Sequence, residues 1–196
     1  MIYYNDFFTT LKDGTVLIVD TCLALHDRFP EFTDALERFE TPHFKTLVPI
    51  DVYLETSKLS VTGKTEETKK KASEALVRMH RGFANNTLQL MKEYSTGSFF
   101  ADPSIIGAAL SLSTSSDVIV LTQDCKLSRD IRAISKSEAV SGGLMDVYKL
   151  ASRGGGVYCF TDLSQKDSND LQMTTKVQLY IKDGSIEHIE YLRKEA

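Results

Sequence analysis

The sequence predicts an α/β protein with a central, mainly parallel β-sheet. Two runs of four consecutive apolar residues, 16–19 and 118–121, are typical of strands buried on both faces. The segments between them have helical patterns, and strands that alternate with helices indicate βαβ units. Each run is closely followed by an acid, Asp20 or Asp124. Ligands collect beyond the carboxyl ends of parallel strands, so we expect both acids at that edge of the sheet.

The first strand is predicted at residues 15–20, directly after the turn dipeptide Asp13-Gly14. A helical pattern begins at 21–25, and a second one covers 31–40. Pro30 is expected to separate these two helices, because proline fits a first turn and breaks a helix interior.

The middle of the chain is predicted to be mostly helical. Residues 44–50 are an apolar segment, either a strand or a connector, and the helix after it carries Glu55. Residues 60–71 are polar throughout and predict an exposed loop that leads into a charged helix start. A long helical stretch is expected over 66–94, and small and polar residues near position 85 are where it can break into a helical hairpin.

Further elements are predicted beyond residue 100. One helix is expected to begin with Asp102 as its N-cap and Pro103 in its first turn. A helix is predicted at 126–136, then a short helix that ends at Ala151, then a strand at 157–161.

The chain is predicted to hold one domain, residues 1–162, and a C-terminal extension, residues 163–196. Within the extension, 176–182 and 185–192 flank Asp183-Gly184, which is a strong short-range hairpin signal. A length of 196 residues agrees with one domain and a small appendage.

Composition excludes some classes of protein. The formal net charge of −4 has no global basic signature of a nucleic-acid-binding domain, although a local basic patch remains compatible with it. The three cysteines lack paired spacing and are predicted to be reduced thiols. No apolar window reaches the length of a membrane span and no secretory signal is evident, so we expect a cytoplasmic protein without membrane contact.

Four carboxylates are the candidate catalytic residues: Asp20, Glu55, Asp102 and Asp124. Gathering like charges is unfavourable unless some are protonated or a cation neutralises them. Oxygen ligands without a converging set of His or Cys favour Mg²⁺ or Mn²⁺ over Zn²⁺. Each acid taken alone has a simpler explanation: Asp20 as a cap of a backbone N–H, Asp102 as a helix N-cap, and Glu55 as a solvated side chain.

The four segments that hold these acids resemble, in order and content, the four motifs of PIN-domain nucleases. That family includes toxins of toxin–antitoxin pairs and RNA-processing nucleases. The similarity covers about residues 15–135, and its motifs are Val16–Thr21, Pro49–Lys58, Phe100–Ala109 and Val118–Asp124.

The resemblance implies a three-layer α/β/α, Rossmann-like fold and a Mg²⁺- or Mn²⁺-dependent active site. It also implies hydrolysis of RNA phosphodiester bonds by a metal-activated water, which leaves 5′-phosphate and 3′-hydroxyl ends. The metal-binding quartet would be Asp20, Glu55, Asp102 and Asp124, with Thr122 as the hydroxyl residue that supports the last acid. Cys22 departs from the pattern, because many family members have Asn or Ser there.

Two further groups of residues are weaker candidates. Asp130 could be a fifth acid near the site, but its surroundings are also typical of a solvated helix face. A set of basic residues could contact RNA phosphates, although interspersed glutamates favour a solvated charged helix at least equally. This basic set consists of Lys64, Lys69, Lys70, Lys71, Arg78 and Arg81.

The leading hypothesis is therefore a metal-dependent endoribonuclease with RNA as its partner. A toxin role would add an antitoxin protein as a second partner, and a homodimer is compatible with the sequence. Two alternatives remain open. One is a PIN-like module that has lost catalysis and binds RNA or protein, and the other is a structure-specific DNA nuclease.

Overall fold

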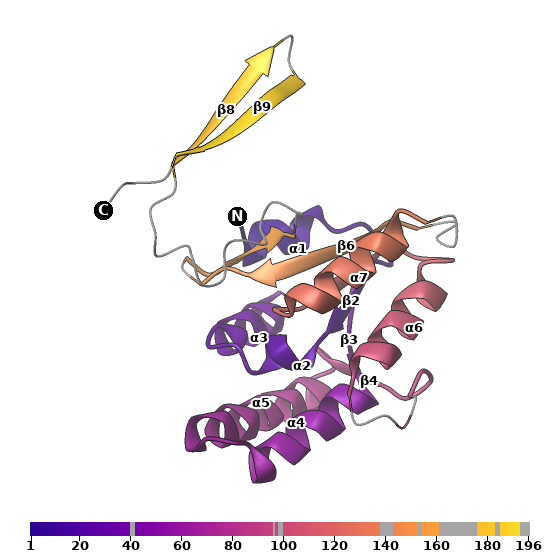
Figure 1. Cartoon of the computed structure of the whole chain (residues 1–196). Coiled ribbons are helices and arrows are strands. Elements are labelled where there is room, and N and C mark those ends of the chain that lie inside the picture. Colours follow the sequence, from indigo (N-terminus) through magenta and orange to yellow (C-terminus); the bar gives the residue numbers. More distant parts are fainter. Residues whose placement is uncertain are drawn as a thin grey trace. The chain divides into compact units, whose positions relative to one another are not determined.

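The computed structural model describes residues 1–39, 42–95, 97, 100–137, 143–152, 154–160, 176–182 and 185–192. The chain divides into two compact units, Met1–Phe160 and Thr161–Ala196. Figure 1 shows the helices and strands of both units.

The first unit alternates strands with helices. In chain order its elements are β1 (Ile2–Tyr3), α1 (Tyr4–Thr10), β2 (Val16–Val19), α2 (Thr21–Ala24), α3 (Phe29–Arg38), β3 (Lys45–Pro49), α4 (Ile50–Thr62), α5 (Glu66–Ala84), β4 (Gln89–Met91), α6 (Asp102–Leu112), β5 (Val118–Leu121), α7 (Cys125–Ser135), β6 (Met145–Leu150) and β7 (Gly156–Cys159).

The sheet has seven strands in the order β1-β7-β6-β5-β2-β3-β4. β2 pairs in parallel with both β3 and β5, β3 pairs in parallel with β4, and β5 pairs in parallel with β6. β7 is antiparallel to β6, and β1 is antiparallel to β7. Every residue of β2 and β5 is buried, as their apolar sequences predict. The predicted mainly parallel sheet is confirmed.

The helices form a layer on each face of the sheet. The chain runs outward from β2 to β3 and β4, and then crosses back to β5 and β6. Right-handed crossovers in opposite directions along a sheet place their helices on opposite faces. Accordingly, α3 packs beside α1 and α5 in one layer, whereas α6 packs on β5 and β2, and α7 packs on β6 (Figure 1). The predicted three-layer α/β/α fold is confirmed.

Helix α1 was not anticipated by the sequence, and aromatic packing explains its position. The Phe8 side chain is fully buried, and its ring centroid lies 5.3 Å from that of Phe44 and 5.8 Å from that of Phe32. The ring centroid of Phe7 lies 5.1 Å from that of Tyr148 on β6. These contacts involve residues distant in sequence, so no local pattern in residues 1–14 shows them.

The short helix predicted to end at Ala151 is wrong, because this segment is strand β6. Met145 and Val147 are buried, and β6 pairs in parallel with β5 from Val118 to Leu121. Hydrogen bonds to a strand about 27 residues earlier in the chain decide the conformation, and they leave only a weak period-two pattern in the sequence.

The helix predicted over 66–94 is right only in its first part. Helix α5 ends at Ala84, and Gln89–Met91 pairs with β3 as the edge strand β4. Asn86 has a φ of 57°, which turns the chain sharply after the helix. The helical hairpin is instead formed by α4 and α5, which lie side by side (Figure 1).

The helix predicted at 31–40 begins two residues earlier, at Phe29, so that Pro30 lies in its first turn. Helix α2 is a single turn. Asp102 is not the N-cap of α6 as predicted, because Ala101 occupies that position. Cys22, Cys125 and Cys159 are free thiols, as expected. None of the described helices is long and apolar enough to span a membrane.

The second unit contains the hairpin that the sequence predicts. β8 (Lys176–Lys182) and β9 (Ser185–Leu192) are antiparallel, with Lys176 opposite Leu192 and Lys182 opposite Ser185. Asp183 and Gly184 lie outside the described residues.

Candidate active site

The ends of β2 and β5 bring Asp20 and Asp124 to the same edge of the sheet. The two strands are adjacent and parallel, with Val19 opposite Leu121. The Asp20 amide continues this pairing and donates to the Leu121 carbonyl at 3.1 Å. Both acids therefore follow strands that end at one level, which is the arrangement that places ligand-binding groups in α/β sheets.

Asp20 is a buried acid, only 2% exposed, whose carboxylate is held on both oxygens. As the N-cap of α2, it accepts from the Thr21 amide at 2.6 Å and from the Cys22 amide at 3.3 Å. The Thr122 hydroxyl donates to its Oδ2 at 2.6 Å. These bonds satisfy amides at the start of α2 and orient the carboxylate.

Thr122 links the two acids. Besides donating to Asp20, its hydroxyl oxygen accepts from the Asp124 amide at 2.9 Å. The Asp124 carboxylate caps α7, where Oδ1 accepts from the amides of Lys126 at 2.5 Å and Leu127 at 3.0 Å. The Thr122 hydroxyl thus contacts the carboxylate of Asp20 and the backbone amide of Asp124.

The other two acids reach this edge from α4 and α6. Glu55 is half-buried on α4, and its Oε2 accepts from the Thr21 hydroxyl at 2.7 Å. Thr21 is therefore a second supporting hydroxyl that sequence reasoning missed, although its position directly after Asp20 is a usable signal. Asp102 is the first residue of α6 and is half-buried.

Charge interactions couple Asp20 with Asp102 and Asp102 with Asp124, and all four acids act on the Cys22 thiol. Burial raises the pKa of Asp20 to about 6, against the lowering effect of the Thr122 and Thr21 hydrogen bonds, and Asp102 raises it further. The pKa of Asp102 is raised by burial, then by the charge of Asp124. Although Cys22 as a residue is exposed, the pKa of its thiol is raised to about 12 by burial and by the charges of all four acids.

The negative charges of all four acids thus act on one group, the Cys22 thiol, and these acids are Asp20, Asp124, Glu55 and Asp102. Such a set of hard oxygen donors of like charge fits a divalent cation such as Mg²⁺ or Mn²⁺. In the part of the chain that the structure describes, no three His, Cys, Asp or Glu side chains are already grouped closely enough to hold a metal ion. Coordination by three of these acids therefore requires their carboxylates to move closer together.

Asp130 is exposed on α7 and lies within electrostatic reach of Asp102, because its charge contributes to raising the Asp102 pKa. Lys126, which the sequence did not single out, has the opposite effect on the same carboxylate. The charges of both side chains therefore act on Asp102.

The predicted basic set lies mainly on α5, where its members form ion pairs. Lys71 contacts Asp27 and Glu67, each at 2.8 Å, and Arg78 contacts Asp34 at 2.6 Å. Similar pairs join Lys69 to Glu66, Lys70 to Glu74, and Arg81 to Glu37 and Asp34. Three of these pairs lie within α5, as in an ordinary charged helix, whereas Arg78 and Arg81 pair with acids of α3 and Lys71 also pairs with Asp27. Contacts of this set with RNA stay a prediction.

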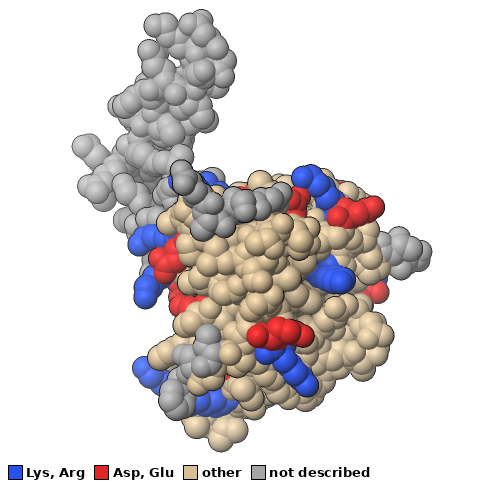
Figure 2. Space-filling model, turned by 90° about the vertical axis from the view of Figure 1, so that its right-hand side faces the viewer, with Lys and Arg blue, Asp and Glu red and all other residues tan. Residues whose placement is uncertain are grey.

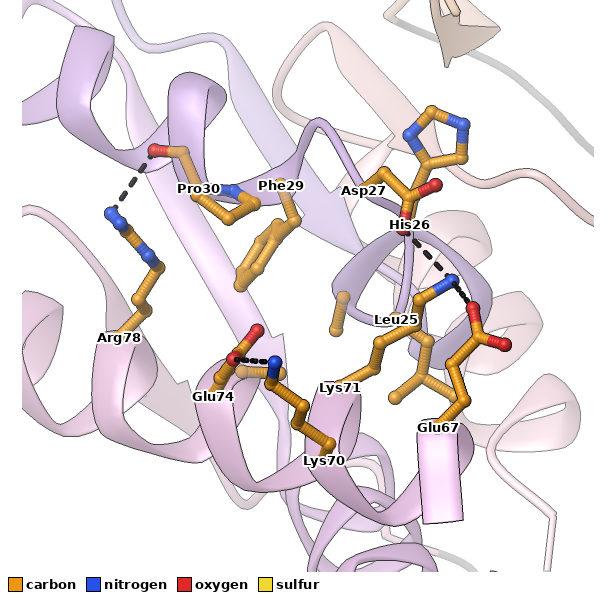
Figure 3. Close-up of a pocket in the computed structure, with 12 residues that line it drawn as sticks. Leu25, His26, Asp27, Phe29, Pro30, Glu67, Lys70, Lys71, Glu74 and Arg78 are labelled. Atoms are coloured by element: carbon orange, nitrogen blue, oxygen red, sulfur yellow. Dashed lines mark hydrogen bonds and ion pairs between the residues drawn. The ribbon is translucent and has the colours of Figure 1, made fainter. Parts of the chain in front are cut away.

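A cavity of about 300 Å³ lies between α5 and the segment after α2. Figure 3 shows Lys71 between Asp27 and Glu67 at this cavity, and Lys70 directed toward Glu74. None of the four acids of the candidate site lines it. On the face seen in Figure 2, the coloured Lys and Arg side chains are scattered among Asp and Glu and form no continuous basic patch.

Replacing Thr122 by Val is expected to lower the free energy of unfolding by about 1–3 kcal/mol, because a buried carboxylate oxygen and the Asp124 amide each lose a partner. Urea denaturation measures this loss. Thr122→Ser keeps the hydroxyl and is the matched control, with most of the stability retained. An equal loss in Thr122→Ser, which removes only the methyl group, would contradict the special contribution assigned to the hydroxyl.

No protein-family model matches the sequence, and no curated protein matches it. Among solved structures, the chain is similar to the structure of the PIN domain endonuclease Utp24, with a TM-score of 0.49 and 16% sequence identity. The alignment covers 76% of this chain and 94% of that chain. A likeness of this size carries no conclusion about activity.

Proposed function

We propose that this protein is a PIN-type endoribonuclease that depends on Mg²⁺ or Mn²⁺. The observation that supports this proposal best is the junction of β2 and β5. Two adjacent parallel strands are followed by acids, and one buried hydroxyl, Thr122, contacts both Asp20 and Asp124. The charges of Glu55 and Asp102 act on the Cys22 thiol together with those of Asp20 and Asp124.

The acids Asp20, Asp102 and Asp124, with Glu55, would hold the divalent ion, which supplies charge neutralisation at the phosphodiester and activation of water. The chain's own groups orient these acids. Helix α2 and Thr122 hold the Asp20 carboxylate, and the first turn of α7 holds that of Asp124. Neither a histidine base nor a covalent nucleophile is needed.

RNA is the proposed substrate because the four motifs resemble those of a family that includes ribonuclease toxins and RNA-processing nucleases. All four motif acids are present, so a catalytically inactive module is not favoured. A role as the toxin of a toxin–antitoxin pair is a narrower proposal, which depends on the proposed ribonuclease activity. It would be supported if expression of the chain arrested bacterial growth and expression of the Asp20→Asn variant did not.

The test uses the purified full chain and single-stranded RNA carrying a label at its 5′ or 3′ end. We expect cleavage within the strand in Mn²⁺ or Mg²⁺, products with 5′-phosphate and 3′-hydroxyl ends, and no cleavage after metal removal by EDTA. Cleavage that persists in EDTA would overturn the proposal.

Two parallel measurements separate the alternatives. Flap or branched DNA cut in preference to RNA would support a structure-specific DNA nuclease. An ion that binds only the folded state stabilises it by about 2.7 kcal/mol at a hundred times its dissociation constant. Absence of both cleavage and stabilisation by Mn²⁺ would support an inactive binding module.

A further inference from the structure

Lys149 is a buried lysine at the end of β6, only 5% exposed. Its ammonium group donates to the Gln123 carbonyl at 3.1 Å and to the Cys125 sulfur at 3.2 Å. It also lies 5.0 Å from the centroid of the Phe160 ring. None of the ion pairs formed by the described residues includes this side chain.

A buried cation without a carboxylate partner is unfavourable, and lysines are rarely buried unless they are paired. A methionine would fill much of the same volume without the desolvation penalty. The overall stability of the fold therefore does not explain why a lysine is at position 149. The groups that its ammonium bonds are the better explanation.

The two hydrogen-bonded partners of Lys149, Gln123 and Cys125, are the residues on either side of Asp124. Two more bonds fasten the same turn to β6. The Gln123 side-chain amide donates to the Leu150 carbonyl at 3.0 Å, and the Thr122 amide donates to the Tyr148 carbonyl at 3.1 Å. Among these three attachments, only Lys149 bridges both sides of the acid.

The direction of the Asp124 carboxylate depends on this turn. Its Oδ1 accepts from the amides of Lys126 and Leu127, so a shift at the start of α7 would carry the carboxylate with it. The carboxylate of Asp20 is held by the first turn of α2 and by Thr122, which belongs to the turn that contains Asp124. The relative position of the two acids therefore depends on how firmly residues 122–125 are attached to β6.

We infer that Lys149 is a positioning residue: its ammonium group, bonded on both sides of Asp124, sets the place of that carboxylate relative to Asp20. The consequence for catalysis rests on the proposed function, whereas the effect on the turn does not. Supporting groups of this kind typically contribute about 10- to 100-fold to activity or metal affinity.

The chain offers a matched control on the same helix and strand. Arg132 on α7 donates to Asp146 on β6 at 3.4 Å, about two turns beyond Asp124. Arg132→Met removes a half-buried cation between α7 and β6 without touching residues 122–125. Lys149→Met removes the cation at the start of the same helix.

The first measurement is amide hydrogen exchange by NMR on the full chain without metal. We expect Lys149→Met to lower the protection of the Lys126 and Leu127 amides about tenfold or more, and Arg132→Met to leave both amides within about twofold of the parent protein. The second measurement is RNA cleavage in Mn²⁺. We expect kcat to fall about 10- to 100-fold in Lys149→Met, with little change in KM.

A folded Lys149→Met protein with unchanged protection at both amides would overturn the inference. If this variant does not fold, Lys149→Gln replaces it with the same readouts, because a shorter neutral amide cannot bridge both partners. Should the parent protein cleave no RNA, the proposed function fails, and the exchange rates alone still decide the positioning role of Lys149.

Discussion

Replacing Asp20 by Asn is expected to lower the rate of RNA cleavage at least about a hundredfold, since even supporting groups of metal sites contribute 10- to 100-fold. The substitution changes little in volume and keeps an acceptor for the Thr21 amide. Of the four candidate acids Asp20 is the one that is buried, and the substitution removes its negative charge, which is coupled to Asp102. We therefore expect a folded protein without Mn²⁺-dependent cleavage.

Asp146→Asn is the matched control for this experiment. Asp146 is also a partly buried acid of the sheet, and burial raises its pKa as it does that of Asp20. It lies on β6 and contacts Arg132, outside the group of four acids. Its variant should cleave RNA within about twofold of the parent rate. Equal cleavage by the Asp20→Asn protein would contradict the proposed site.

The second large effect is expected in the pH dependence of stability without metal. Folding raises the pKa of Asp20 from 3.8 to about 6, chiefly because burial disfavours the charged form. Between these two values the folded state binds more protons than the unfolded state, so stability falls as the pH rises. Below about pH 4 the buried Asp20 costs the folded state no stability. Above about pH 6, where Asp20 is charged in both states, the loss of stability reaches its full size.

The size of this effect is on the order of 3 kcal/mol, from a shift of about two pKa units at 1.36 kcal/mol each. Urea denaturation of the parent protein and of Asp20→Asn in EDTA, from pH 4 to pH 8, isolates the contribution of Asp20. The stability of the parent relative to the variant should decrease across this window. A difference that does not change with pH would contradict the expectation.

Addition of Mn²⁺ at pH 7 should reverse the effect. A cation held by the carboxylates favours their charged forms, so the parent protein should gain stability from Mn²⁺ while Asp20→Asn gains little. The comparison separates a metal site from an acid that is merely buried. A buried acid without a metal site would show the pH effect but no response to Mn²⁺.

Local sequence patterns were sufficient for the parts of the fold that carry strong apolar signals. The strands β2 and β5 were predicted because their residues are apolar without interruption, as burial on both faces requires. The hairpin of β8 and β9 was predicted from its turn residues. Strands β4 and β6 were missed because their conformation depends on pairing with β3 and β5.

The sequence by itself determined which acids are available, namely Asp20 and Asp124 after apolar strands and Glu55 and Asp102 in the helical segments between them. Only the tertiary structure decided how they are held. The Thr122 hydroxyl donates to Asp20, 102 residues away, and Thr21 bonds Glu55 across 34 residues. Lys149, which no motif marked, lies beside Asp124 because β6 pairs with β5. Such contacts depend on which strands become neighbours, and that order is set by long-range packing rather than by local sequence.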